Sequence, residues 1–221
     1  MNLIKISNSI YTCEFPTGNV VNGVTIKVNI WLVLNGTDIY IIDTGFDYMT
    51  KELIPYLNAL GTPKALLVTH GHLDHILGAH RLVREFGIPR YANQLEIDEI
   101  DRGVAPYPTK EHELTCFFTA FDEKVLEEAG LTLYTTPGHS PGHTIFYHEK
   151  DNVLMVGDLF TTTEKQLLPP INKFTPNMTE SIDNGAVIDS IKPALITSAH
   201  GENIVYNETL YPQLVLLFRE E

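Results

Sequence analysis

The residue types best suited to chemistry gather in the stretch THGHLDH, residues 69–75. Within six positions it offers four candidate metal ligands, His70, His72, Asp74 and His75, directly after a short apolar run. Imidazole and carboxylate groups suit zinc, iron or manganese. In an extended or tightly turned loop, His70 and His72 point the same way and can grip one ion. Asp74 and His75 come at the turn into the next helix, where they can face a second ion. The cluster therefore predicts a metal site.

Three further candidate ligands each follow an apolar, strand-like run. His139 lies in the turn TTPGHSPGH, Asp158 ends VLMVGD, and His200 follows ALITSA. Their shared position predicts that they lie at a sheet edge where strand ends converge. The predicted metal ligands are therefore His70, His72, Asp74, His75, His139, Asp158 and His200.

The elements that must position these groups alternate between strand and helix. Residues 24–45 are typical of two strands joined by a turn at Asn35-Gly36. Residues 65–69 form a short apolar run, as expected of a strand buried on both faces. Residues 50–61 and 76–87 predict helices, and each stretch ends at a glycine.

The second half of the chain repeats this alternation. Asn177 and Glu180 resemble a capping box for a helix over 179–191, and residues 206–218 predict an amphipathic helix. The sequence indicates a layered α/β arrangement. The least regular segment, Asp98–Phe121, either covers a site or forms a surface loop. The strands predicted in this half are 131–136, 144–148, 152–158 and 194–199.

Composition narrows the class of protein. The 221-residue chain has a formal net charge of −13, so its surface repels phosphate backbones and a nucleic-acid partner is disfavoured. The N-terminus lacks the apolar core of a signal peptide, and nothing approaches a membrane span. We therefore expect a cytoplasmic protein. Cys13 and Cys116 lack metal-site spacing and are expected to be buried, reduced thiols. The oligomeric state stays open.

The ordered set of motifs resembles the metallo-beta-lactamase superfamily. The resemblance comprises the HxHxDH motif, a single His, an Asp and a final His, with the IDTG strand end upstream, and it runs from about Ile39 to Gly201. It implies an α+β fold, the four-layer αβ/βα sandwich of that superfamily, in a single domain over residues 1–221.

The resemblance also divides the ligands into two sets. The first metal would be held by His70, His72 and His139, the second by Asp74, His75 and His200, and Asp158 would bridge both. Asp43, in IDTG, matches the family's buried aspartate that supports the ligand loop. His143 is expected to hydrogen-bond near the site, whereas His80, His112 and His148 occupy no motif position.

This ligand set predicts a hydrolase with two zinc ions, although iron or manganese would also suit it. Two cations about 3.5–4 Å apart share a water and lower its pKa, which gives a bridging hydroxide that attacks a carbonyl or phosphoryl centre. Asp74 is placed to orient this nucleophile and to relay its proton. The expected substrate is an ester, thioester, lactone or related small molecule.

Several positions argue against particular branches of the superfamily. The best-known lactamase subclass has Arg where this chain has His75, and flavodiiron enzymes have Glu in place of His72. Acyl-homoserine lactonases typically have Tyr three residues after the bridging Asp, where this chain has Thr161. Asp158 follows His139 by only 19 positions, which leaves no room there for an inserted nuclease domain.

Glyoxalase II shares the THxHxDH and GHxxGH motifs and a GD followed closely by Phe, as in GDLF at 157–160. This match raises a thioesterase interpretation. The basic C-terminal portion that grips glutathione in that enzyme is not evident, because Arg219 is the only cation after Val205. Lys165 and Lys173 could instead anchor an anionic substrate.

Two alternatives to a zinc hydrolase stay open. One is a mononuclear iron oxidoreductase similar to persulfide dioxygenases, which resemble glyoxalase II and use only the first metal's ligands. The other is a non-catalytic metal-binding protein that kept the fold. Under any of them, specificity is expected to depend on the loops at residues 98–121 and 160–178.

Overall fold

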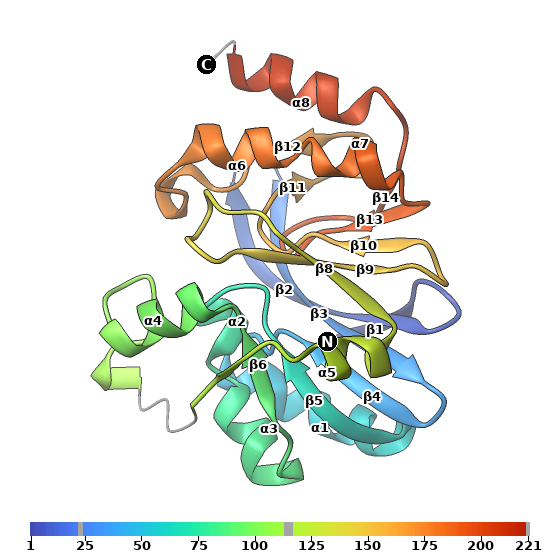
Figure 1. Cartoon of the computed structure of the whole chain (residues 1–221), viewed down its shortest axis with the longest axis vertical. Helices are drawn as coiled ribbons and strands as arrows, with labels where there is room; N and C mark the ends of the chain where they lie inside the picture. Colours follow the sequence, from blue (N-terminus) through green and yellow to red (C-terminus); the bar gives the residue numbers. More distant parts are fainter. Residues whose placement is uncertain (22–23, 113–116, 220–221) are drawn as a thin grey trace.

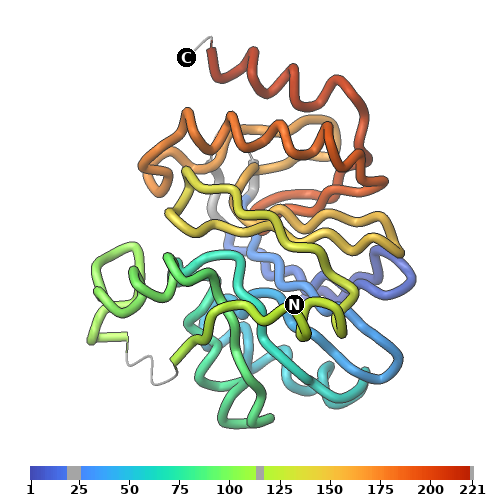
Figure 2. Tube along the Cα trace, in the orientation of Figure 1, coloured from blue at the N-terminus to red at the C-terminus, as the bar shows by residue number. Residues whose placement is uncertain are grey.

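The computed structural model describes residues 1–21, 24–112 and 117–219. Two large sheets face each other, with helices on the outer face of each (Figures 1 and 2). The first sheet consists, in order, of β1 (Asn2–Lys5), β2 (Ile10–Val21), β3 (Val24–Asn35), β4 (Asp38–Ile42), β5 (Thr62–Leu67), β6 (Arg90–Ala92) and β7 (Thr119–Ala120). The second consists of β14 (Ile204–Val205), β13 (Leu195–Thr197), β10 (Val153–Met155), β9 (Thr144–His148) and β8 (Leu131–Thr135), and β11 (Thr161–Thr162) pairs with β12 (Leu167–Leu168).

The helices form the two outer layers. On the first sheet lie α1 (Asp47–Leu60) and α3 (Ala79–Phe86), and on the second lie α6 (Met178–Asn184), α7 (Val187–Ile191) and α8 (Leu210–Arg219) (Figure 1). The shorter elements are α2 (Leu73–Ile76), α4 (Gln94–Arg102), α5 (Glu123–Ala129) and 3₁₀ turns at Lys110–His112 and Asn172–Phe174. No helix within the described ranges is long and apolar enough to cross a membrane.

Strand alternation produces the layers. In β3, the side chains of Ile30 and Leu32 join the core beneath the helices, whereas Trp31 and Val33 join the core between the sheets. Successive side chains of a strand point to opposite faces, so an uninterrupted apolar run fills both cores. The Trp31 indole N–H donates to Thr197 Oγ1 at 2.9 Å, which satisfies its polar atom inside the inter-sheet core.

The predicted helix over 76–87 corresponds to α3, which begins at Ala79; Ile76 is the last residue of the separate helix α2, and Leu77 and Gly78 lie between the two. A Cβ at Gly78 would lie 1.8 Å from Thr50 Oγ1, so only glycine fits against α1 here. The Gly78 N–H donates to the Gly45 carbonyl at 3.1 Å, which ties this break to the turn after β4. As predicted, α3 ends at Gly87, whose φ is +63°.

The helical predictions for the second half are confirmed in position but not in continuity. The Asn177 side chain caps α6 by accepting the Glu180 N–H at 3.3 Å, and Gly185 and Ala186 then separate α6 from α7. The last helix begins at Leu210, later than predicted, because β14 ends at Val205 and residues 206–209 form the turn that leads into the helix. Cys13 is a free, buried thiol, and Cys116 lies outside the described residues.

Candidate metal centre

The seven predicted ligands come together where loops from the two sheets meet. His70 and His72 follow β5, Asp74 and His75 lie on α2, His139 lies between β8 and β9, Asp158 follows β10, and His200 follows β13. All are buried except Asp74, which is partly exposed. The structure therefore brings together side chains from both halves of the chain, as the recurrent strand-end pattern predicts.

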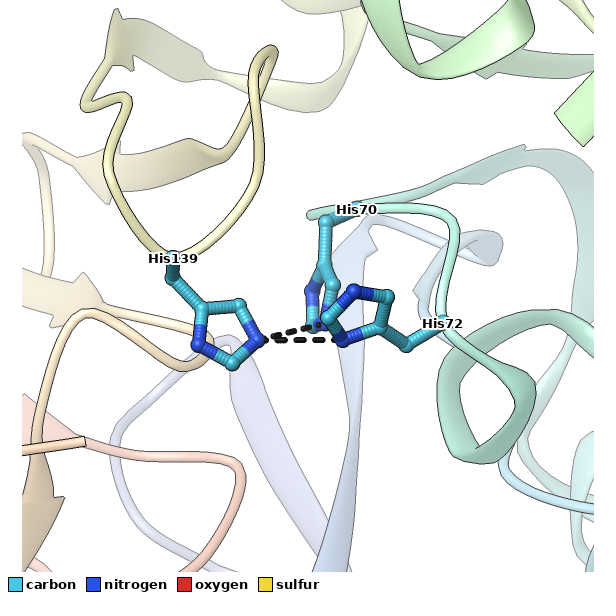
Figure 3. Close-up of side chains that lie close together, drawn as sticks. All are labelled: His70, His72 and His139. Carbon is cyan, nitrogen blue, oxygen red and sulfur yellow. Dashed lines mark hydrogen bonds between the residues drawn. The ribbon is translucent and has the colours of Figure 1, made fainter. Parts of the chain in front are cut away.

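Three histidines form the first group. The Nε2 atom of His139 lies 3.2 Å from Nε2 of His70 and 3.1 Å from Nδ1 of His72 (Figure 3). The rings come from opposite sides, with His139 from the second half and the other two from the first. Nitrogen atoms this close, each with a lone pair, form a suitable set of donors for a single cation.

A second group contains Asp74, His75 and His200. Asp74 Oδ2 lies 3.2 Å from His200 Nε2, and Asp74 Oδ1 lies 3.8 Å from His75 Nε2. Asp158 lies between the two groups. Its Oδ1 is 3.4 Å from His75 Nε2, and its Oδ2 is 3.4 Å from His139 Nε2 and 3.3 Å from His200 Nε2.

Two buried atoms show how well these residues fit a metal. Among the described residues, His75 Nε2 and Asp158 Oδ1 have no hydrogen-bond partner, although they lie 3.4 Å apart. An unsatisfied buried polar atom costs about 1–3 kcal/mol, and more for a charged group. A cation held between them would satisfy both, so the arrangement fits metal ions of the kind that imidazole and carboxylate prefer.

The two groups differ in charge. In the first, burial and neighbouring imidazoles hold the pKa of His70 and His139 low, and burial lowers the pKa of His72 to about 4. In the second, burial is outweighed by the acidic side chains, which raise the pKa of His75 to about 9 and that of His200 well above its usual value. The first group is thus neutral and ready to coordinate, whereas a cation must displace protons from the second.

Hydrogen bonds outside the cluster fix the orientation of four rings. The pairs are His70 Nδ1 with Thr69 Oγ1 (3.1 Å), His75 Nδ1 with Asp43 Oδ2 (2.8 Å), His139 Nδ1 with Thr175 Oγ1 (3.0 Å) and His200 Nδ1 with the Lys27 carbonyl (2.9 Å). A carboxylate or carbonyl only accepts, so His75 and His200 carry a proton on Nδ1 and turn Nε2 toward the cluster. Sequence reasoning missed Thr175 and Lys27, which have no local motif.

Comparison with known proteins settles the family. Residues 24–200 match the family model of the metallo-beta-lactamase superfamily. The chain belongs to this superfamily. The layers described above are accordingly its four-layer αβ/βα sandwich, as predicted.

Individual members of the superfamily resemble the chain to different extents. A probable metallo-hydrolase, YybB of Bacillus subtilis (strain 168), is 42% identical over the full length of both chains. A hydroxyacylglutathione hydrolase of Nitrosomonas eutropha is 33% identical over 65% of this chain and 54% of that protein. The solved metallo-beta-lactamase of Pontibacter korlensis is 19% identical with a TM-score of 0.72, covering 100% of this chain and 99% of that one. These findings bear out the prediction of a metal-dependent hydrolase.

Asp43 occupies the position expected of the superfamily's supporting aspartate. Its Oδ1 accepts the Thr69 N–H at 2.8 Å, and its Oδ2 accepts from the Thr69 hydroxyl at 2.7 Å and contacts His75 Nδ1 at 2.8 Å. Asp43 has a φ of +62°, a left-handed conformation that asparagine also tolerates. Asp43→Asn therefore removes the charge without straining the backbone.

In the Asp43→Asn variant, an amide N–H can face the Nδ1–H of His75, which drives the ring proton to Nε2, the atom turned toward the cluster. We expect zinc affinity to fall roughly 10–100-fold, as is typical when an outer partner of a metal ligand is lost. Competition with a chromogenic chelator measures this affinity. The control is Asp47→Asn, because Asp47 pairs with Arg81 away from the cluster. Equal affinities in both variants would contradict the role of Asp43.

The remaining histidines lie outside the predicted set of ligands. His143 Nε2 accepts the Asp158 N–H at 3.0 Å and its Nδ1 lies 2.9 Å from Thr136 Oγ1, so both nitrogens are occupied, as expected of a residue that supports the site. His80, His112 and His148 each form a hydrogen bond three residues away in their own segment.

A cavity of about 580 Å³ opens onto His72, Asp74, Asp158 and His200. Its other walls are mainly apolar and include Ile26, Val28, Phe46, Leu73, Pro106, Ile171 and Phe174. A second cavity, of about 310 Å³, shares Pro106, Lys173 and Phe174 with it and reaches His139. Residues 98–121 border this space through Pro106 and Tyr107, so part of this segment covers the site.

Proposed function

We propose that this protein is a dinuclear zinc hydrolase that cleaves an ester, thioester, lactone or related bond in a small molecule. The observation that carries the proposal is the convergence of seven ligating side chains, with His75 Nε2 and Asp158 Oδ1 unpartnered within the described part of the chain. The ligands form two groups of three, and Asp158 contacts imidazoles of both groups. This arrangement suits two cations better than one.

Bound there, two zinc ions would lower the pKa of a water held between them and polarise the substrate oxygen. Asp74 supplies the proton chemistry. Its side chain, 29% exposed, lines the larger cavity. Burial raises the pKa of its carboxyl, but His75 and His200 outweigh this and hold it below the usual range. Asp74 is therefore ionised at neutral pH and can orient the attacking water by accepting a hydrogen bond from it. We propose that it also passes the proton of this water to the leaving group.

The cavities support a small substrate with an apolar part. Their volumes are those of small-molecule sites. Lys173, which lines both, is the only lysine or arginine in either wall among the described residues, and its Nζ lies 5.3 Å from the ring centre of Phe174. We propose that an anionic group of the substrate lies near Lys173, while an apolar group lies against Phe46 and Ile171.

A substrate panel on zinc-loaded protein tests this function. The panel contains lactones, thioesters (including a hydroxyacylglutathione, after the superfamily relatives), phosphodiesters and β-lactams. We expect turnover of an ester-like substrate, about two zinc ions per chain, loss of activity in His72→Ala and retention in His80→Ala, a histidine outside the cluster. Activity that survives His72→Ala would overturn the assignment. One iron per chain with oxygen consumption on persulfides would favour the mononuclear oxidoreductase, and absence of any metal would favour a non-catalytic protein.

A further inference from the structure

Glu96, on α4, is a carboxylate that the proposed chemistry does not use. It is 0% exposed, although charged side chains are rarely buried completely. Its Oε2 accepts the Gly71 N–H at 2.7 Å and the Tyr107 hydroxyl at 3.2 Å, and its Oε1 accepts the Gly142 N–H at 2.6 Å. Burial raises the pKa of Glu96, while the two backbone hydrogen bonds favour its ionised form.

The two backbone donors belong to the two loops that supply the first ligand group. Gly71 lies between His70 and His72, and Gly142 lies three residues after His139. One carboxylate therefore connects the ligand loop of the first half of the chain to that of the second half. Within the first group, His139 Nε2 lies at nearly the same distance from the two imidazoles of the other loop, 3.2 Å from His70 Nε2 and 3.1 Å from His72 Nδ1.

Close packing at both glycines keeps α4 against the loops. A Cβ at Gly71 would lie 2.7 Å from the Tyr107 ring, and a Cβ at Gly142 would lie 2.9 Å from the Asn93 side chain. Gly71 thus lets one ligand loop approach Tyr107 and the α4 residue Ile100, and Gly142 lets the other approach the N-cap of α4, more closely than any larger residue permits. The Tyr107 ring in turn contacts the His72 ring, with centroids 5.2 Å apart.

The local sequence would assign Glu96 a different role. Asn93 is the N-cap of α4 and Glu96 stands three residues later, the spacing of a capping box, in which Glu bonds back to the N-cap N–H. Asn93 does cap the helix by accepting the Leu95 N–H at 3.0 Å. Glu96 instead turns into the protein toward Gly71 and Gly142, so its position reflects the loops and not the cap.

We infer that Glu96 is a positioning residue that sets the separation between the His70–His72 loop and the His139 loop, and so the affinity of the metal ion held by these three histidines. The inference rests on the proposed function, because it requires a metal there. A carboxylate is needed since all three partners are donors. In Glu96→Gln, one amide oxygen can still accept an N–H, but the amide nitrogen faces the other donor and that loop is released.

Zinc titration against a chelator tests the inference on the full chain. In Glu96→Gln we expect the Kd of one of the two zinc ions to rise roughly 10–100-fold while the other stays unchanged, because only one ligand group spans the two loops. The matched control is Asp101→Asn, an exposed carboxylate on the same helix, which should bind zinc as the wild type does. A merely structural role predicts that Glu96→Gln lowers Tm equally with and without zinc and leaves both Kd values unchanged, and this result would overturn the inference.

Glu96→Asp provides a second route if the Gln variant does not fold. Its charge is kept, but its side chain is one methylene shorter and reaches only one of the two N–H groups. A higher Kd for one of the two zinc ions supports the inference, and wild-type Kd values for both ions overturn it. The wild-type titration separates the two proposals: no zinc bound there refutes the proposed function itself, whereas two ions bound equally well in all variants refute only the role of Glu96.

Discussion

Asp158→Ala is expected to leave fewer than two zinc ions per chain and to abolish most turnover. Asp158 lies within 3.4 Å of imidazoles from both groups, so its loss weakens both positions at once. The expected loss exceeds the roughly 10–100-fold that removal of an outer partner costs.

Elemental analysis of dialysed protein and steady-state kinetics measure these effects. Glu164→Ala is the matched control, because Glu164 is an exposed carboxylate in the segment that follows Asp158. Near-normal zinc content and turnover in Asp158→Ala would show that the carboxylate does not connect the two groups.

Asp74→Asn is expected to reduce kcat by roughly 10²–10⁴-fold, the usual contribution of a positioned general acid or base. The amide keeps the size of the side chain and an oxygen near His200, but it cannot accept a proton. The proposed proton relay therefore predicts a much larger loss of kcat than of bound zinc.

Measuring both zinc content and kcat separates a loss of proton transfer from a loss of metal. The control is Asp98→Asn, because Asp98 is an exposed carboxylate. The more severe Asp74→Ala variant should lose zinc as well as turnover. If Asp74→Ala keeps near-normal turnover and metal content, Asp74 has no part in the reaction.

Much of this site was predictable because its information is local. Except for Asp74 and His75, which lie on the short helix α2, each predicted ligand stands at the end of an apolar strand or in the turn that follows. Strand ends meet at sheet edges, so residues such as His139 and His200 could be selected from their flanking residues alone. The layers were predictable for a similar reason, since apolar runs such as β3 must be covered on both faces.

The supporting contacts were not predictable, because they join segments far apart in the chain. Thr175 meets His139, and the Lys27 carbonyl meets His200, without any pattern near either partner. Helix breaks such as Gly78 depend on how closely another element approaches, which the periodicity of one segment does not reveal. Glu96 was missed for a different reason: it does have a local pattern, but its spacing from Asn93 indicates an ordinary helix cap.

The contribution of ligands from both halves of the chain has a mechanical consequence. His70 and His72 follow the first sheet and His139 precedes a strand of the second, so zinc bound by these residues would act as a removable cross-link between the two sheets. Binding to the native state alone at 1,000 times Kd would add about 4 kcal/mol to the free energy of unfolding. Chelation would then remove this cross-link and the stability that it adds, and would leave the apolar core between the sheets to hold them together.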